Sequence, residues 1–238
     1  MTQPFFSIII PTLNEEENIE NLLADIKRQT YNEYEIIVSD GNSNDNTVKI
    51  VKKFDVNLLI NNNRGVANQR NSGVKEATGE YLLFLDADNN LESSFLDKLK
   101  KQIEVNNPDV FTCYVNNNLS LLKERIVVNF LNFYIHLSYI FSSPGAIGAC
   151  IGCKKDIFSK KTEFVQSMVP FEDGAFVRNL HRRGFNCQIF QEPRFGYSLR
   201  RFEENGFINT FLKYIKLSFK RKIFMRTLNL NKDYRMGG

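Results

Sequence analysis

Two carboxylates directly follow one of the most apolar short runs in this sequence. Residues 81–85 read Tyr-Leu-Leu-Phe-Leu, and Asp86 and Asp88 come next with Ala87 between them. An unpaired carboxylate inside a buried strand costs several kcal/mol, so we expect both aspartates at the carboxyl end of a strand. In open α/β sheets that end borders the usual ligand crevice. Carboxylate oxygens there can hold Mg²⁺ or Mn²⁺, and the metal can hold phosphates.

Other acidic residues also lie where predicted strands end or predicted helices begin. Glu15 and Asp40 follow two further apolar runs, and Glu172 and Asp173 open a helical segment. Taken alone, each of them is better explained as a solvated cap or turn carboxylate. Together they favour a binding crevice, because the carboxyl ends of successive parallel strands meet at one edge of a sheet. There Glu15, Asp40 and Asp86 could accept hydrogen bonds from a nucleoside while one carboxylate binds a metal.

Arg70 is the basic residue that could enter the same crevice. It lies in residues 64–73, in a predicted helix that Gly65 opens. One interpretation is a solvated arginine on the outer face of that helix. The other is a guanidinium directed into the crevice, where it can bind a base carbonyl or a phosphate.

Strands and helices alternate along the first hundred residues, which predicts how these side chains are positioned. β-Branched and aromatic runs indicate strands, and apolar side chains recurring every three or four residues indicate helices between them. Asn14 and Glu17 would cap the first helix as a capping box. The alternation predicts βαβ units and a mostly parallel, Rossmann-like α/β sheet flanked by helices. We expect strands at residues 5–10, 34–39, 57–60, 81–85 and 110–115, and helices at 19–26, 47–54, 65–75, 93–105, 119–141, 171–183 and 205–224.

The second half of the chain contains a glycine-rich stretch and an uncharged helical segment. The glycines of residues 145–152 predict a strand or bend where the backbone approaches a ligand closely. Residues 126–141 carry no formal charge but include Asn129, Asn132 and His136, and they are short for a membrane span. We therefore expect a buried or membrane-facing helix there, with a transmembrane helix as the alternative.

Composition indicates one globular domain with a full core. The chain has 238 residues, of which 42% are hydrophobic and 24% are charged. We expect the domain over residues 1–200 and a short extension over 201–238. With four cysteines and two histidines, neither a disulfide framework nor a structural zinc site is expected, and Cys150 and Cys153 should be small residues of a packed strand. Reduced thiols favour the cytoplasm, and the N-terminus shows no secretory signal pattern.

Basic residues are concentrated at the C-terminal end. From Ser198 onward there are ten Lys and Arg residues and three acidic residues, a net charge of +7, although the whole chain carries only +4. Apolar residues alternate with these cations from Phe207 to Phe219, which predicts a basic amphipathic helix. Such a helix can lie on anionic lipid, or it can pack its apolar stripe on the core or on a partner chain. Nucleic acid is disfavoured, because the excess charge is confined to one terminus.

The motifs occur in an order and spacing that resemble one known family. Over about residues 5–200 the chain resembles the family 2 glycosyltransferases with the GT-A fold. A D-x-D triplet alone is common, but the complete ordered set is specific. The motifs are P-T-L-N-E at Pro11–Glu15, D-G at Asp40–Gly41, R-N-x-G at Arg70–Gly73, D-A-D at Asp86–Asp88, and E-D at Glu172–Asp173.

The resemblance implies roles for the residues on the nucleoside side of the crevice. Pro11, Thr12 and Glu15 match the loop that contacts the nucleoside. Asp40 matches the acid that reads the base, and Arg70 occupies a basic position near the base and the phosphates.

The resemblance also implies roles at the reacting end of the donor. Asp86 would approach the ribose or the metal, and Ala87 beside it would contact the nucleotide-sugar. Asp88 would be the direct ligand of Mg²⁺ or Mn²⁺. Asp173 matches the catalytic base, with Glu172 beside it near the acceptor or the diphosphate. A carboxylate that takes the acceptor's proton during attack gives single displacement with inversion, and the metal stabilises the departing diphosphate.

One motif departs from the pattern of many polymerising members of this family. They carry Q-x-x-R-W after the base, whereas residues 198–202 of this chain read Ser-Leu-Arg-Arg-Phe. Arg200 and Arg201 could still meet a diphosphate, or they could form a solvated basic turn. The departure favours transfer of a single sugar over processive polymer synthesis.

The resemblance leads to one expected function and two alternatives. We expect transfer from a nucleotide-sugar, such as a UDP-sugar, to a hydroxyl acceptor that can be lipid-linked, on the cytoplasmic face of a membrane. The donor sugar would contact loops near Asn89–Asn90 and residues 148–153, whose types suit many sugars. A sugar nucleotidyltransferase would carry a glycine-rich, basic phosphate loop in place of Pro11–Glu15. A catalytically silent nucleotide-binding or membrane-scaffold protein would not need both Asp88 and Asp173.

Overall fold

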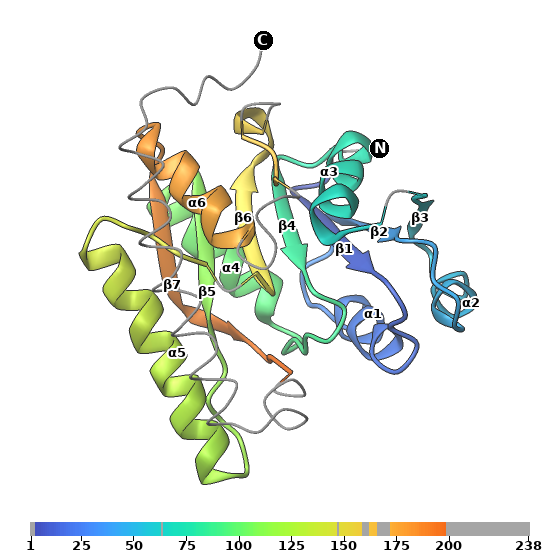
Figure 1. Ribbon diagram of the computed structural model, residues 1–238, viewed down its shortest axis with the longest axis horizontal. Coiled ribbons are helices and arrows are strands. Elements are labelled where there is room, and N and C mark those ends of the chain that lie inside the picture. Colours follow the sequence, from blue (N-terminus) through green and yellow to red (C-terminus); the bar gives the residue numbers. More distant parts are fainter. Residues whose placement is uncertain (1–2, 63, 147, 159–161, 166–171, 199–238) are drawn as a thin grey trace. The chain divides into compact units, whose positions relative to one another are not determined.

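A seven-stranded β-sheet forms the centre of the described part of the chain (Figure 1). The computed structural model describes residues 3–62, 64–146, 148–158, 162–165 and 172–198. The strands lie in the order β3-β2-β1-β4-β6-β5-β7. They are β1 (Phe6–Thr12), β2 (Tyr34–Asp40), β3 (Asn57–Ile60), β4 (Tyr81–Leu85), β5 (Val110–Val115), β6 (Cys150–Lys154) and β7 (Cys187–Phe195).

All of these strands except β6 run in one direction. β2 pairs in parallel with β1 and β3, and β1 pairs in parallel with β4. β6 is antiparallel to both β4 and β5, and β7 is parallel to β5. The carboxyl ends of β1, β2, β4, β5 and β7 therefore lie at the same edge, and the expected mostly parallel sheet is confirmed.

Helices cover both faces of the sheet. In Figure 1, α3 and α6 lie in front of the sheet and α4 lies behind it. One core cluster joins Ala67 of α3 and Phe176 of α6 to Ile9, Leu82 and Phe84 of the strands. The helices are α1 (Ile19–Lys27), α2 (Thr47–Val51), α3 (Val66–Glu76), α4 (Phe95–Asn106), α5 (Leu122–Ile140) and α6 (Glu172–Arg182), with a short 3₁₀ helix η1 (Lys155–Ile157).

Most predicted elements match the structure, and one strand is unexpected. The strands predicted at residues 57–60 and 110–115 coincide with β3 and β5. β6 contains Cys150 and Cys153 as buried free thiols, which confirms their prediction as small residues of a packed strand. No strand is predicted for β7, because Pro193 and several polar residues interrupt its apolar pattern. Pairing with β5 forms it nevertheless.

The first helix begins later than its predicted cap. α1 starts at Ile19, and its N-cap Asn18 makes no side-chain capping bond. Asn14 has a φ of 55°, in the left-handed region. Its N–H donates to Ser43 Oγ at 2.9 Å, and its Oδ1 accepts from the Asn44 N–H at 2.9 Å. The predicted capping box is wrong, because Asn14 instead forms the turn that ties the loop after β1 to the loop after β2.

The predicted C-terminal extension lies outside the described residues. The chain divides after Tyr197, and the predicted domain boundary at residue 200 stays a prediction. Arg200, Arg201 and the helix expected at residues 205–224 fall in the part that is not described. Within the described ranges, none of the helices combines the length and apolar character that crossing a bilayer requires.

Candidate active site

Asp40 joins the ends of β1 and β2. Thr12 and Asp40 are register partners, and Thr12 Oγ1 donates to Asp40 Oδ2 at 2.8 Å. Ser43 donates from its backbone N–H to Oδ1 at 2.8 Å and from its hydroxyl to Oδ2 at 2.6 Å. The residue is 0% exposed, and these hydrogen bonds compensate the burial of its charge. Asp40 is therefore a fixed part of the junction between the ends of β1 and β2, beside the loop that follows β1.

The loop after β1 places Glu15 in this region. Pro11, at the end of β1, is buried. The Glu15 N–H donates to Thr47 Oγ1 at 2.8 Å, and its Oε2 accepts from Asn18 Nδ2 at 2.8 Å. Neither Ser43 nor Thr47 is among the residues that the sequence motifs single out. A signal for both exists, since they are hydroxyl residues in the polar segment that directly follows a strand ending in a carboxylate.

Gln69 fixes the same loop from the buried face of α3. It is 3% exposed, and its Nε2 donates a short hydrogen bond to the carbonyl oxygen of Thr12. A Cβ at Gly41 would lie 2.7 Å from that nitrogen, so a larger residue there would displace the Gln69 amide. Gln69 is not among the residues that the sequence motifs single out. A long polar side chain on the apolar side of a predicted helix is the signal that would find it.

Arg70 is buried at the centre of the site. Its Nη2 donates to Asp86 Oδ1 and to the Gly148 carbonyl oxygen, each at 2.9 Å, and its Nη1 donates to Glu172 Oε1 at 3.3 Å. The guanidinium lies 5.1 Å from the centroid of the Phe164 ring, and the side chain is 2% exposed. The interpretation of Arg70 as a solvated arginine is therefore wrong. This residue links the end of β4 to the start of α6.

Asp86 and Asp88 lie in a turn that is tied to the start of β6. The Asp86 N–H donates to the Ala149 carbonyl oxygen at 3.2 Å, and the Asn89 N–H donates to the Asp86 carbonyl oxygen at 3.1 Å. The Asn89 side chain donates a short hydrogen bond to the same Ala149 oxygen and is 1% exposed. The Asp86 side chain is 36% exposed, and Asp88 is partly exposed. Asn89 therefore anchors a turn that presents two carboxylates at the sheet edge.

Asp173 lies in the first turn of α6, beside Glu172 and close to Gly148. Burial raises the pKa of Asp173 to about 6, and the charge of Glu172 adds to the rise. A 2.6 Å hydrogen bond from the Gly174 N–H and the positive charge of Arg70 oppose it. A Cβ at Gly148 would lie 2.7 Å from Asp173 Oδ2. A carboxyl group whose pKa approaches the working pH is well suited to act as a general base.

Two buried polar atoms accompany this carboxylate without a hydrogen-bond partner among the described residues. They are Arg70 Nε and Glu172 Oε2, and Glu172 is only 7% exposed. Such atoms usually indicate a ligand, a water or an ion. The charge of Asp86 also raises the pKa of Asp173. The carboxylates that follow β4 and those that open α6 therefore belong to one site.

The carboxylate oxygens at this site suit a metal ion that binds together with a phosphate-containing ligand. Asp86 and Asp88 supply carboxylate oxygens from one partly exposed turn. Across the described ranges, no group of three or more His, Cys, Asp or Glu side chains could hold a metal by itself. Mg²⁺ usually binds through one or two carboxylates plus substrate phosphates and waters. The residues present fit such an ion when a diphosphate completes its coordination.

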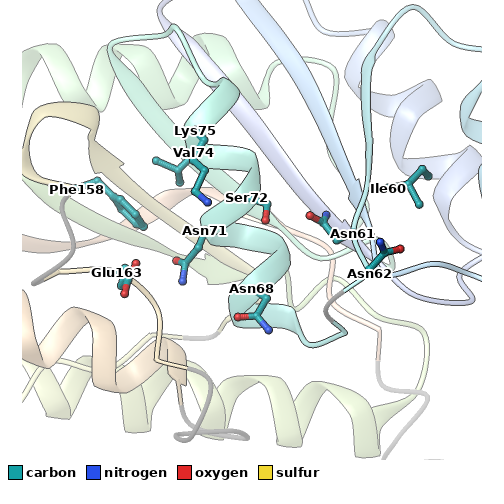
Figure 2. A pocket seen from close by; sticks show the side chains of 10 residues that line it. All are labelled: Ile60, Asn61, Asn62, Asn68, Asn71, Ser72, Val74, Lys75, Phe158 and Glu163. Carbon is teal, nitrogen blue, oxygen red and sulfur yellow. The ribbon is translucent and has the colours of Figure 1, made fainter.

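A separate groove of about 510 Å³ lies beside α3 and contains none of the predicted site residues (Figure 2). Two of its amides have structural partners. Asn71 exchanges hydrogen bonds of 2.9 and 3.0 Å with the backbone of Phe164, and Asn61 Nδ2 donates to Ser39 Oγ at 2.7 Å. The groove lining is Ile60, Asn61, Asn62, Asn68, Asn71, Ser72, Val74, Lys75, Phe158 and Glu163.

The fold is that of the GT-A class of glycosyltransferases, as predicted. It resembles the mannosyltransferase PcManGT from Pyrobaculum calidifontis, solved with GDP-Man and Mn²⁺, with a TM-score of 0.70 and 20% identity over 91% of this chain and 65% of that chain. It also resembles residues 1–349 of TarS from S. aureus, solved with UDP, with a TM-score of 0.61 and 22% identity over 81% of this chain and 60% of that chain. At these identities the likeness establishes the fold alone.

The sequence identifies the family. Residues 7–161 match the model of glycosyl transferase family 2, and this chain belongs to that family. A Campylobacter jejuni relative, GalNAc(5)-diNAcBac-PP-undecaprenol beta-1,3-glucosyltransferase, is 33% identical over 129 residues, which cover 51% of this chain and 42% of that protein. Among eight curated relatives the matched share of the relative's length runs from 36% to 54%. The chain thus corresponds to about half of those proteins or less.

Proposed function

We propose that this chain transfers a single sugar from a UDP-sugar to a hydroxyl group of a lipid-linked acceptor, with inversion at the anomeric carbon. The main support is the raised pKa of Asp173, about 6. Asp173 lies next to Glu172, which Arg70 links to Asp86 through two ion pairs. Family membership supports sugar transfer, and the similar TarS structure holds UDP. The name of the Campylobacter relative, which includes PP-undecaprenol, supports a lipid-linked acceptor.

In this mechanism the residues of the chain bind the donor and move one proton. Thr12 and Asp40 form the nucleoside end of the crevice, and Arg70 holds Asp86 in position. Asp173 takes the proton of the acceptor hydroxyl as that oxygen attacks the anomeric carbon, and a pKa of about 6 leaves the carboxylate ionised at neutral pH. Asp86 and Asp88 would hold Mg²⁺ or Mn²⁺, which when bound stabilises the negative charge on the departing diphosphate.

We also propose where the enzyme is located and how many sugars it adds to each acceptor. We assign the protein to the cytoplasmic face of a membrane, with the basic extension 201–238 touching anionic lipid. Arg200 and Arg201 would contact the diphosphate. The departure of residues 198–202 from Q-x-x-R-W supports one transfer per acceptor rather than polymer synthesis.

A donor screen tests the proposal. The full chain is incubated with UDP-sugars or GDP-sugars, Mn²⁺ and a membrane lipid extract, and released nucleoside diphosphate is measured. We expect release that depends on both a UDP-sugar and the lipid. Asp88→Asn should abolish this release, and Asp173→Asn should lower transfer by about 10²–10⁴-fold while calorimetry still detects binding of UDP with Mn²⁺.

Other outcomes of the screen identify the rival functions. Nucleotide binding without turnover of any donor would indicate a catalytically silent protein. Condensation of a sugar phosphate with a nucleoside triphosphate would indicate a nucleotidyltransferase. Equal turnover with water-soluble acceptors would contradict the lipid-linked acceptor but not the sugar transfer.

A further inference from the structure

The outer face of α5 and its two flanks carry most of the exposed large apolar side chains in the described part of the chain. Eight of the twelve such side chains lie there. No acidic residue follows Glu124 on this helix. Exposed apolar surface of this extent indicates an interaction site. The eight side chains are Leu121, Leu122, Ile126, Phe130, Phe133, Tyr134, Ile140 and Phe141, here called the apolar stripe.

The opposite face of α5 is fixed to the sheet. Its buried residues are Val128, Asn132 and Ile135. Asn132 Oδ1 accepts from the Val115 N–H and Asn132 Nδ2 donates to the Val115 carbonyl oxygen, each at 2.9 Å. These two bonds hold α5 against the end of β5. The apolar stripe therefore points away from the sheet on a helix that cannot easily turn to bury it.

A pocket of about 290 Å³ adjoins the stripe and shares Phe133 with it. None of the residues lining it in the described chain is acidic. Arg194 Nη1 donates to Asn117 Oδ1 at 2.9 Å, while its Nε donates to the exposed Glu192 at 3.0 Å. Tyr114 Oη and His136 Nδ1 share a hydrogen bond of 2.7 Å. A guanidinium, an imidazole and amides around one pocket can donate several hydrogen bonds to an anionic group.

The pocket lies toward the sheet edge that carries the candidate active site. Tyr114 is near the carboxyl end of β5 and Arg194 is near that of β7, and both strands run in the same direction as β4. Gly196 exchanges backbone hydrogen bonds of 3.2 and 2.7 Å with Asn90, two residues beyond Asp88. Arg194 precedes Gly196 by two strand residues, about 7 Å. The pocket is thus connected through a short stretch of backbone to the turn that carries the paired aspartates.

We propose that the apolar stripe of α5 docks on a lipid bilayer and that the adjoining pocket takes the anionic head of a membrane lipid. An amphipathic helix with aromatic and aliphatic residues on one face inserts that face at the boundary of headgroups and acyl chains. No acidic residue follows Glu124 on α5 and none lines the described pocket, and this charge distribution, together with Arg194, complements a negative lipid surface. This deepens the proposed function, on which it rests, because a lipid-linked acceptor presents its hydroxyl at a membrane surface.

A single tryptophan tests whether α5 itself enters the bilayer. The chain contains no Trp, so Tyr134→Trp in the full chain is a lone fluorescent reporter on the stripe. Val105, 82% exposed on α4, gives the matched control Val105→Trp. Vesicles of phosphatidylcholine with phosphatidylglycerol should shift the emission of Tyr134→Trp to shorter wavelength, and brominated acyl chains should quench it. Val105→Trp should show neither change.

Two results of this experiment would overturn the proposal. One is pelleting of the protein with vesicles while the Tyr134→Trp emission stays unchanged, which would mean that another segment binds. The other is a spectral shift that rises with protein concentration and needs no lipid, which would indicate a second copy of the chain on α5.

Affinity measurements separate the stripe from the pocket. In vesicle sedimentation, Ile126→Ser and Ile140→Ser should each weaken binding roughly tenfold, because each removes most of one apolar side chain. Arg194→Gln should reduce the preference for vesicles with phosphatidylglycerol over pure phosphatidylcholine. Arg28→Gln, which removes a cation from the exposed C-cap position of α1, should leave that preference unchanged. Equal effects of the two arginine variants would overturn the pocket assignment.

These measurements are independent of catalysis. Vesicle binding needs no donor, so a protein that docks but transfers no sugar would disprove the proposed function alone. A protein that transfers sugar to soluble acceptors but whose stripe variants bind vesicles as the native chain does would disprove the docking alone. Circular dichroism of each variant checks that the exposed substitutions leave the fold intact.

Discussion

Arg70 donates a 2.9 Å hydrogen bond from Nη2 to Asp86 while its side chain is only 2% exposed. The same guanidinium contacts Glu172, which stands next to Asp173 at the start of α6. The positively charged group therefore holds the turn after β4 against the helix that carries the candidate base. This burial gives Arg70 a positioning role that is separate from any contact with the donor.

Removing the Arg70 guanidinium should destabilise the fold. Arg70→Gln leaves Asp86 and Glu172 without their cation, and breaking a buried ion pair from one side costs about 3–5 kcal/mol. We expect a loss of that order in the free energy of unfolding, measured by urea titration. Arg28→Gln breaks an exposed pair with Asp25 and should cost less than about 1 kcal/mol. Similar losses in the two variants would contradict the positioning role.

The rate of sugar transfer should depend on the ionisation of Asp173. With a pKa of about 6, the base is protonated at low pH, and activity should rise through pH 6 to a plateau above pH 7. Asp173→Asn should lower turnover by about 10²–10⁴-fold, the usual contribution of a general base, and the residual rate should lack the inflection near pH 6. The measurement is kcat against pH. An unchanged profile in Asp173→Asn would remove Asp173 from the role of base.

Ionisation of Asp173 should also lower stability. Its pKa is higher in the folded chain, about 6, than in the unfolded chain, near 3.9. Between pH 4 and pH 6 the folded state therefore binds more protons than the unfolded state. The free energy of unfolding falls as pH rises through this range, so the stability that protonated Asp173 contributes is fully present below pH 4 and is lost as pH rises through 6. Asp173→Asn should be more stable than the native chain at pH 8 by about 1–3 kcal/mol, with little difference at pH 4. Urea titrations of both proteins at pH 8 and pH 4 measure this difference in the free energy of unfolding. A stability difference that grew toward low pH would contradict the raised pKa of Asp173.

A methyl group at Gly148 should displace the candidate base. In Gly148→Ala the new Cβ would lie 2.7 Å from Asp173 Oδ2 and 3.2 Å from its Cβ, so the carboxylate must move. A misplacement of about 1 Å can cost roughly 10²-fold in rate, and we expect a fall of that order in kcat. Gly145→Ala is the matched control, because its Cβ would meet only Ser138 Oγ at 3.6 Å. Equal turnover in the two variants would show that the close contact has no catalytic consequence.

The metal dependence of nucleotide binding should require Asp88. Asp88→Asn should weaken binding of UDP in the presence of Mn²⁺ by at least about tenfold, a loss typical even of outer partners of a metal site. Chelation of the metal from the native chain should weaken UDP binding similarly, and chelation should have little further effect in the variant. Calorimetry with and without Mn²⁺ provides the measurement, and Asp97→Asn on α4 serves as the control. Full Mn²⁺-dependent binding by Asp88→Asn would assign the metal elsewhere.

Local sequence features were sufficient to predict much of the fold and the chemistry of the strand ends. The strands at 57–60 and 110–115 follow from short apolar runs bounded by polar residues. Asp40 and Asp86 could be placed at strand ends because burying an unpaired charge within a strand is costly. Their common edge follows from the parallel direction that alternating strands and helices impose. These inferences need only the local residue pattern and the order of strands and helices along the chain.

Long-range contacts decided the rest. The sequence left Arg70 either solvated or in the crevice, and its pairing with Glu172, 102 residues away, settled its burial. Neither the left-handed turn at Asn14 nor the pairing of β7 with β5 has a local signature strong enough to predict it. Whether the apolar residues of α5 would face the core was likewise undecided until Asn132 fixed the helix to β5. Periodicity along a chain specifies which residues share a face, but only packing determines what that face meets.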